Sequence, residues 1–231
     1  MKRFWTEVAV DGEREVTLDG RPVRTPGRAA LALPTPALAE AVAEEWRAVT
    51  GEVDPRAMPL TGLANAAIDR IAPDPRGFAA GLARYGESDL LCYRADGPAP
   101  LVERQAALWD PPLGWARTRY DVHFEIATGV IHLPQPPATL ARLGEAIAAR
   151  GAFELAPMSV VVTITGSLVL ALALAEGAMT AEEVWRAAEL DEDWQAEQWG
   201  EDALAVQARE ARRQEFEAAA RFLELAAVAD R

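Results

Sequence analysis

The densest group of side chains that could do chemistry is a run of carboxylates near the C-terminal end of the chain. Its members are Asp191, Glu192, Asp193, Glu197, Glu201 and Asp202. Two carboxylates held side by side can act as a general acid and a general base. The same residues can also form a solvated helix face, and near a helix N-terminus their charge complements the helix dipole. We favour the solvated face, keep a partner-binding role as the alternative, and expect no catalysis here.

Tryptophans lie among these carboxylates. Trp194 and Trp199 are inside the acidic run, and Trp185 precedes it. Large flat rings beside charged groups are typical of protein interfaces, where a few such residues carry most of the binding energy. Anchoring in the protein's own core is the more common role of a tryptophan, so both roles remain open for these three.

Other residues that could carry chemistry lack the neighbours that the chemistry needs. The two histidines, His123 and His132, have no cluster of carboxylates or cysteines beside them in the sequence, and a metal site needs more ligands at a recognisable spacing. The sequence contains no glycine pattern typical of a dinucleotide or phosphate loop, and no Ser, His and Asp set indicates a triad. We therefore expect neither a cofactor nor a metal ion.

The overall charge restricts the partners. The 231 residues include 36 Asp and Glu against 23 Lys and Arg, for a formal net charge of −13. A field of this sign repels phosphate backbones, so nucleic acid is not expected to bind. Cys92 is the single cysteine, so no internal disulfide can form, which fits a reducing compartment. The first residues show no signal or transit peptide pattern, and we expect a cytoplasmic bacterial protein.

One segment has the length of a membrane span. Residues 156–175 carry no charge, but Pro157 lies near their start, and Glu154 and Glu176 flank them without a basic residue to set an orientation. We expect a buried helix rather than a span. Small residues recur at every fourth position of this helix and would pack inside the protein's own bundle or, alternatively, against a partner; they are Ser159, Thr163, Ser167, Ala171 and Ala175.

The first third of the sequence has the pattern of β structure. Asp11-Gly12 and Asp19-Gly20 each separate short alternating apolar runs, which is the strongest short signal for a hairpin with a type I′ turn. Two such turns predict a three-stranded antiparallel meander, and residues 29–33 could add a fourth strand. A helix is then expected to begin after Thr35, which has the residue type of an N-cap, and to end at Gly51.

Helical patterns dominate the rest of the sequence, with one exception. In residues 122–133 apolar and polar side chains alternate, which predicts a hairpin that returns to the N-terminal sheet. Thr180 and Glu183 have the spacing of a capping box that opens a helix. Apolar residues recur at helical spacing from 216 to 227 and predict the last helix.

These elements predict the fold class and its division. The fold class is α+β, since a small antiparallel sheet with one helix packed on it is followed by helices. We expect a β-rich N-terminal domain of residues 1–57 and a mainly α-helical C-terminal domain of residues 58–231.

Six sequence blocks, taken together, resemble one known family. They are residues 18–26, 58–70, 89–94, 109–111, 165–177 and 191–200. Their order and spacing are similar to those of the chaperones that bind the α subunit during assembly of F1 ATP synthase, in mitochondria and in related bacteria. The resemblance extends from about Phe4 to about Leu225. The chain departs from the family pattern at Gly62, where a basic residue is expected, and at Pro112 and Gly114.

The resemblance implies a two-domain fold and a role. The role is to bind the free F1 α subunit, to shield the surface that later meets the β subunit, and to release the subunit during assembly, with no cofactor. It also implies relatives in the mitochondrial matrix. The family's acidic block suggests the contact surface, so the predicted partner-binding residues are Glu192, Trp194, Glu197, Trp199 and Glu201. We expect the free protein to be a monomer that does not insert into a membrane.

Three other functions stay open at this point. A small-molecule enzyme would require scattered catalytic residues to meet in a deep pocket, and Arg70, Tyr93 and Arg94 are the candidates. The chain could also be an interaction module for an unrelated protein. A membrane protein built around residues 156–175 is the third.

Overall fold

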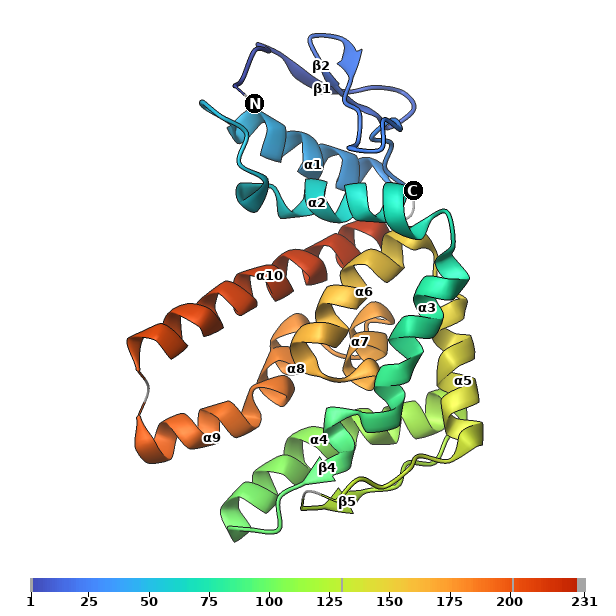
Figure 1. Ribbon diagram of the computed structural model, residues 1–231, viewed down its shortest axis with the longest axis vertical. Coiled ribbons are helices and arrows are strands. Elements are labelled where there is room, and N and C mark those ends of the chain that lie inside the picture. The colour runs from blue at the N-terminus through green and yellow to red at the C-terminus, as the bar shows by residue number, and fades with distance from the viewer. Residues whose placement is uncertain (1, 130, 201, 228–231) are drawn as a thin grey trace. The chain divides into compact units, whose positions relative to one another are not determined.

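The computed structural model describes residues 2–129, 131–200 and 202–227, and these group into two compact units. The first unit holds the described residues up to Pro75, Gly151–Pro157 and those from Ala218 onward. The second unit holds the described parts of Arg76–Arg150 and Met158–Glu217. Figure 1 labels the main helices and strands of both units. A small sheet in the first unit and helices in the second confirm the predicted α+β class.

The predicted three-stranded meander is present in the first unit. Strands β1 (Val8–Val10), β2 (Val16–Leu18) and β3 (Arg21–Pro22) pair antiparallel in that order. Asp19 and Gly20 connect β2 and β3 with positive φ angles of 48° and 74°, as a type I′ turn requires. The Asp19 carboxylate also accepts hydrogen bonds from the amides of Thr6 and Glu7, at 3.0 and 2.8 Å.

The turn between β1 and β2 differs from the expected type I′ turn at Asp11-Gly12. Val10 pairs with Val16, so the loop spans five residues, and its positive φ lies at Arg14 (62°) rather than at Gly12. The Asp11 carboxylate accepts hydrogen bonds from the amides of Glu13 and Glu15, both at 2.9 Å. This side chain closes a longer loop, which the dipeptide signal does not distinguish from a two-residue turn. Residues 29–33 contribute isolated bridges to residues 15 and 24 rather than a full fourth strand.

Helix α1 (Pro36–Ala48) packs on this sheet, and helix α2 (Pro59–Ala66) packs on α1 (Figure 1). The Thr35 hydroxyl accepts a hydrogen bond from the Leu38 amide at 3.1 Å, which confirms the predicted N-cap. Glu45 of α1 accepts hydrogen bonds from the amides of Leu60 and Thr61, both at 2.8 Å, and so caps α2 from the side. The strands and α1 bury one apolar core around Trp5, Leu38 and Trp46, among others.

A π-helical turn (Ala67–Ile71) continues α2 and also belongs to the first unit. Its Asp69 accepts hydrogen bonds from the Thr25 hydroxyl and the Gly27 amide, both at 2.7 Å. Elements just after residue 57 are therefore tied to those before it. The expected domains, 1–57 and 58–231, are defined by their ability to fold on their own, so this division stays a prediction.

The second unit is built from helices. They are α3 (Pro75–Ala83), α4 (Ala99–Tyr120), α5 (Pro137–Ala148), α6 (Ala152–Thr165), α7 (Leu168–Ala175), α8 (Ala181–Ala188), α9 (Leu190–Trp199) and α10 (Ala203–Ala227), of which α3, α6 and α10 also have residues in the first unit. Short 3₁₀ helices occur at Pro55–Ala57 in the first unit and at Arg84–Ser88 and Leu90–Cys92 in the second. The predicted capping box opens α8, since Thr180 and Glu183 each bind the other's backbone amide.

The predicted hairpin at residues 122–133 is wrong. In the described part of this segment, strand β5 (Ala127–Thr128) pairs in parallel with β4 (Tyr93–Arg94), and neither joins the N-terminal sheet. The backbone of His123 bonds to the Thr139 hydroxyl, and the backbone of Glu125 bonds to the Gln135 amide. These side chains thus satisfy the backbone amides and carbonyls that a partner strand would otherwise bind. The alternation of apolar and polar residues still places Val122 and Phe124 in the protein interior.

The uncharged segment 156–175 forms two helices rather than the single one expected. Gly166 has a φ of 65° and ends α6, and the Ser167 hydroxyl accepts a hydrogen bond from the Leu170 amide to begin α7. The small residues expected along one helix face are therefore divided between α6 and α7. Among the described residues, none of the helices combines the length and the apolar character that a membrane span requires.

Candidate functional site

Four members of the acidic run predicted from the sequence, Asp191, Glu192, Asp193 and Glu197, lie on α9, and Asp202 lies just before α10. Asp191, Glu192 and Asp193 form the first turn of α9, where negative charge complements the helix dipole. Leu190 is buried and fixes this end of the helix on the second unit. The chain reverses direction after Trp199 and returns as α10, so α9 has α4 on one side and α10 on another (Figure 1).

A buried carboxylate that the sequence did not single out lies at the junction of α8 and α9. The Glu189 side chain is only 4% exposed and pairs with Arg209 at 3.0 Å and with Arg212 at 3.3 Å. Burial raises the pKa of Glu189, and the neighbouring Glu192 adds to this effect, while the two guanidiniums oppose it. Its partners are 20 and 23 residues away on another helix, so no local spacing indicates the contact.

Two of the predicted acidic positions continue this set of ion pairs toward α10. Glu192 binds Arg212 at 2.5 Å, and Asp193 binds Arg209. The pairing holds α9 beside α10 through charged groups. Glu192, which we expected to meet a partner, is thus already engaged within the protein, although half of its side chain remains exposed.

Trp194 and Glu197 face the other neighbour, α4. Arg104 of α4 donates to both carboxylate oxygens of Glu197 at 2.8 Å, and its guanidinium lies 4.9 Å from the centre of the Trp194 ring. The hydrogen bonds from Arg104 lower the pKa of Glu197, so this carboxylate is ionised at neutral pH. Cation–π contact and ion pair together position these two side chains on the surface.

Trp199 is the predicted residue that points most freely into solvent. Its side chain is 79% exposed at the end of α9, and Leu204 and Val206 at the start of α10 are 78% and 45% exposed. Asp202 between them caps α10 by accepting hydrogen bonds from the amides of Leu204 and Ala205. Glu201, the fifth predicted residue, lies outside the described residues.

The third tryptophan of the region has a core role. Trp185 is buried, and its ring lies 5.4 Å from the ring of Phe216, centre to centre. The structure therefore divides the aromatic residues that the sequence grouped together: Trp185 is in the core, Trp194 is half-buried under Arg104, and Trp199 is exposed.

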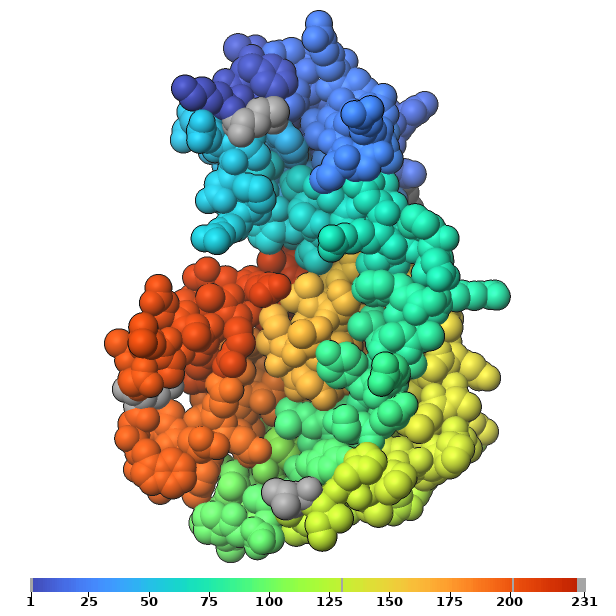
Figure 2. Space-filling view, in the orientation of Figure 1, coloured from blue at the N-terminus to red at the C-terminus, as the bar shows by residue number. Residues whose placement is uncertain are grey.

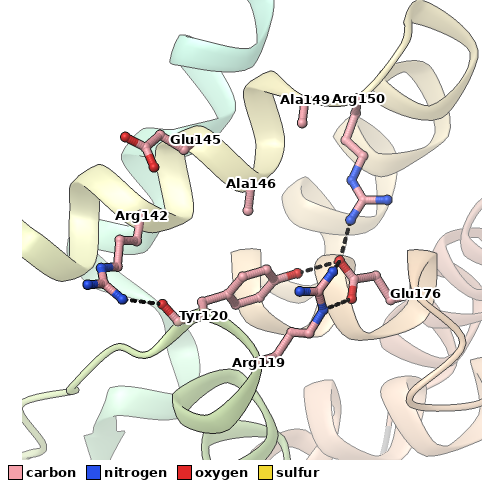
Figure 3. A pocket seen from close by; sticks show the side chains of 8 residues that line it. All are labelled: Arg119, Tyr120, Arg142, Glu145, Ala146, Ala149, Arg150 and Glu176. Carbon is pink, nitrogen blue, oxygen red and sulfur yellow. Dashed lines mark hydrogen bonds and ion pairs between the residues drawn. The ribbon is translucent and has the colours of Figure 1, made fainter.

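A polar pocket of about 420 Å³ lies elsewhere on the second unit, among α4, α5 and α7 (Figure 3). Figure 3 shows Arg119, Tyr120 and Arg150 converging on the carboxylate of Glu176, with Glu145 pointing away from it. Arg119 donates at 2.6 Å, the Tyr120 hydroxyl at 2.8 Å and Arg150 at 2.5 Å. Because both oxygens of Glu176 are occupied by the chain's own donors, this cluster joins helix ends rather than offering a free acid or base.

Two of the residues proposed for a small-molecule enzyme are engaged within the second unit. Tyr93 binds His132 through its hydroxyl, at 2.8 Å, while Arg94 pairs with Asp110 and stacks on Trp109. Arg70 belongs to the first unit, on the π-helical turn. In the ranges that the structure describes, no three His, Cys, Asp or Glu side chains are placed to hold a metal ion.

Solved structures that resemble this protein over nearly its whole length point to chaperones as its class. Atp12 from Paracoccus denitrificans is 43% identical, with a TM-score of 0.92 over 97% of this chain and 98% of that one. A mutant of P. denitrificans Atp12p matches equally well, over 97% of both chains. A protein from Agrobacterium tumefaciens that is proposed to be a chaperone is 42% identical, with a TM-score of 0.90 over 96% and 85% of the two chains.

The model of the ATP12 chaperone protein family matches residues 2–117. The chain belongs to the ATP12 chaperone family. Its role is that of a chaperone, which is not an enzymatic one, and the resemblance found in the sequence blocks is confirmed at the level of the family.

Proposed function

We propose that this protein binds the free α subunit of F1 ATP synthase, covers the surface that later meets the β subunit, and releases it during assembly. Membership of the ATP12 chaperone family supports an assembly role. The observation that carries the proposal is the exposed apolar group Trp199, Leu204 and Val206 at the α9–α10 connection, bordered by carboxylates. We place the protein in the bacterial cytoplasm, as a monomer when free.

A surface of mixed character suits the task physically. An unassembled subunit exposes an apolar interface that would otherwise aggregate. A chaperone has to cover that interface and still yield to the true partner, which disfavours a large, wholly apolar contact. Aromatic anchors supply contact area, and the surrounding charges supply orientation and a fast encounter.

Within this surface we propose different tasks for the predicted residues. Trp199 makes the direct apolar contact, and Glu201, two residues further along the sequence, adds charge. Glu192, Trp194 and Glu197 are engaged with Arg212 and Arg104, and their exposed edges complete the surface while these contacts hold α9 in place.

The experiment is capture of F1 subunits expressed one at a time. Tagged protein is co-expressed with the α subunit alone or with the β subunit alone. The soluble complex is purified, and its molar mass is measured by light scattering. We expect a stable complex with α, rescue of α from aggregation, and no complex with β. Capture of neither subunit by a well-folded protein would contradict the proposed function.

The Trp199→Ala variant tests the surface. Because the ring is exposed, its removal should leave the fold intact and weaken capture of α. Trp115→Ala serves as a matched control, since this half-buried tryptophan of α4 lies outside the proposed surface. Equal capture by wild type and Trp199→Ala would place the contact elsewhere.

A further inference from the structure

The first half of α10, residues 203–215, has no apolar anchor in the interior of the protein. The structure describes all of these residues, and each side chain is exposed or half-buried. The first buried side chain of the helix is Phe216, whose ring packs on that of Trp185, and Phe222 further along belongs to the core of the first unit. Figure 2 shows the first half of α10, in red-orange, at one edge of the second unit, with α9 in orange next to it. We call residues 203–215 the arm, since apolar burial fixes α10 only from Phe216 onward.

Ion pairs tie the arm to α8, to α9 and to the junction between them. Three arginines of the arm supply these pairs, which are Arg209 with Glu189 and Asp193, Arg212 with Glu189 and Glu192, and Arg213 with Glu182. Apart from Glu189, the carboxylates are 44–61% exposed, so water and salt ions reach them. Exposed ion pairs contribute little to stability and weaken further in salt. The buried carboxylate of Glu189 regains its hydration when the arm leaves, which offsets part of the lost attraction.

The arm has the composition of a helix that depends on its neighbours for full stability. Ala, Glu, Arg and Gln make up most of it, and all four favour a helix. Within the arm, Gln214 donates a hydrogen bond to Glu210 one turn away, at 2.9 Å. Helices shorter than about 12–15 residues are nevertheless marginal in water when they lack tertiary contacts. An arm that has separated from α8 and α9 therefore exchanges its amide protons with solvent, and the exchange stops where Phe216 is packed.

We infer that the arm opens and closes on α8 and α9 under the control of these ion pairs, and that its closed state is the one that binds the client. Leu204 and Val206 of the proposed contact surface lie on the arm, so their position depends on its state. A client that binds the closed state shifts the equilibrium toward it, and the apparent affinity scales with the closed fraction. Opening of the arm thereby provides a step at which the client is released. The link to the client rests on the proposed function, whereas the opening itself does not.

Hydrogen–deuterium exchange of the free protein, followed by mass spectrometry, tests the opening. At about 50 mM salt we expect peptides within residues 203–215 to exchange about tenfold or more faster than peptides within residues 216–227. At about 500 mM salt the exchange of the arm should rise about threefold or more, because screening weakens the ion pairs, while residues 216–227 change little. Equal protection of both halves of α10, or exchange of the arm that does not respond to salt, would overturn the inference.

Two double variants of equal charge separate the ties of the arm from the charge of the protein. Glu182→Gln with Asp193→Asn removes two carboxylates that bind the arm from α8 and α9. Glu210→Gln with Glu217→Gln removes two carboxylates that bond to side chains of α10 itself. We expect the first variant to raise the exchange of the arm about threefold or more and the second to leave it close to that of the wild type. All four side chains are exposed or half-buried, so both variants should fold, which circular dichroism checks. Equal effects of the two variants on the arm would overturn its control by these ion pairs.

Addition of the α subunit separates this inference from the proposed function. If α is captured, the arm should exchange more slowly in the complex than in the free protein, as binding to the closed state requires. Capture of α with unchanged exchange of the arm would overturn the link between the arm and the client and leave the proposed function standing. If α is not captured while the arm responds to salt and to the two variants as expected, the proposed function fails and the opening of the arm stands.

Discussion

Single carboxylates on this protein differ in role according to what surrounds them. Glu197 is exposed and bound by one guanidinium, Glu176 is bound by two guanidiniums and a tyrosine, and Asp89 is fully buried among backbone amides. Sequence patterns show acidic residues but not their partners, since Arg104 lies 93 residues from Glu197. The grouping of carboxylates and tryptophans in residues 191–202 is visible in the sequence, whereas the buried role of Glu189 is not.

The substitution Glu197→Lys tests whether the acidic edge of the surface matters. Lysine would lie beside Arg104, so the ion pair is replaced by repulsion on an exposed surface. The urea midpoint should stay close to that of the wild type, whereas capture of the α subunit should fall. Glu103→Lys, an exposed change of equal charge on α4, is the control. Normal capture by a folded Glu197→Lys protein would show that this carboxylate has no part in binding.

Asp89 makes stability depend on pH. Burial raises the pKa of Asp89 to about 6. The hydrogen bonds donated by the amides of Val169 and Leu91 act in the opposite direction and lower this pKa. The folded state therefore binds more protons than the unfolded state between about pH 4 and pH 6. The contribution of Asp89 to the free energy of unfolding is highest below pH 4 and is lost as pH rises through 6.

The comparison with Asp89→Asn isolates this contribution. Urea unfolding at about pH 4.5 and pH 7 should show that the wild type loses about 2 kcal/mol of stability relative to the Asn variant as pH rises. The opposite sign would mean that the amide hydrogen bonds outweigh desolvation, and that the carboxylate is ionised throughout this range.

Two helix caps and one of the two predicted type I′ turns followed the sequence, because their signals were local. The Asp19-Gly20 turn, the Thr35 cap and the Thr180–Glu183 capping box were all predicted from neighbouring residues and are present. The misread segments depend on distant residues. The hairpin expected at 122–133 failed because Thr139 and Gln135 bind its backbone, and the single helix expected at 156–175 ends at Gly166, where the Leu90 amide binds the Gly166 carbonyl.

Gly166 is required at the junction of α6 and α7 by its backbone angle rather than by space. Its φ is 65°, and a Cβ added there would meet its nearest neighbour at 3.9 Å, in ordinary contact. Gly166→Ala should therefore cost about 1 kcal/mol through the left-handed conformation alone. Gly114 lies in the interior of α4 with open space around it, so Gly114→Ala should raise the free energy of unfolding by up to about 1 kcal/mol. Urea unfolding measures the change in stability of both variants, and two changes of the same sign would contradict the argument.

The charge of the whole molecule sets how it meets its client. A net charge of −13 gives the molecule a negative field that repels other copies of the chain and attracts cationic partners. A chaperone of this kind should capture a cationic client quickly and hold it through a limited apolar area. The association rate constant and the dissociation rate constant should then respond differently to salt.

Stopped-flow binding of labelled α subunit at about 50 mM and about 500 mM salt tests this difference. Screening shortens the Debye length from about 14 Å to about 4 Å, so long-range attraction is largely lost. We expect the association rate constant to fall about tenfold or more and the dissociation rate constant to change little, because apolar burial persists in salt. The Glu192→Gln and Asp202→Asn double variant, which carries two negative charges fewer, should show a weaker salt dependence of association. An association rate constant that rises with salt would mean that the negative charge of the protein repels the client, and the charge argument would fail.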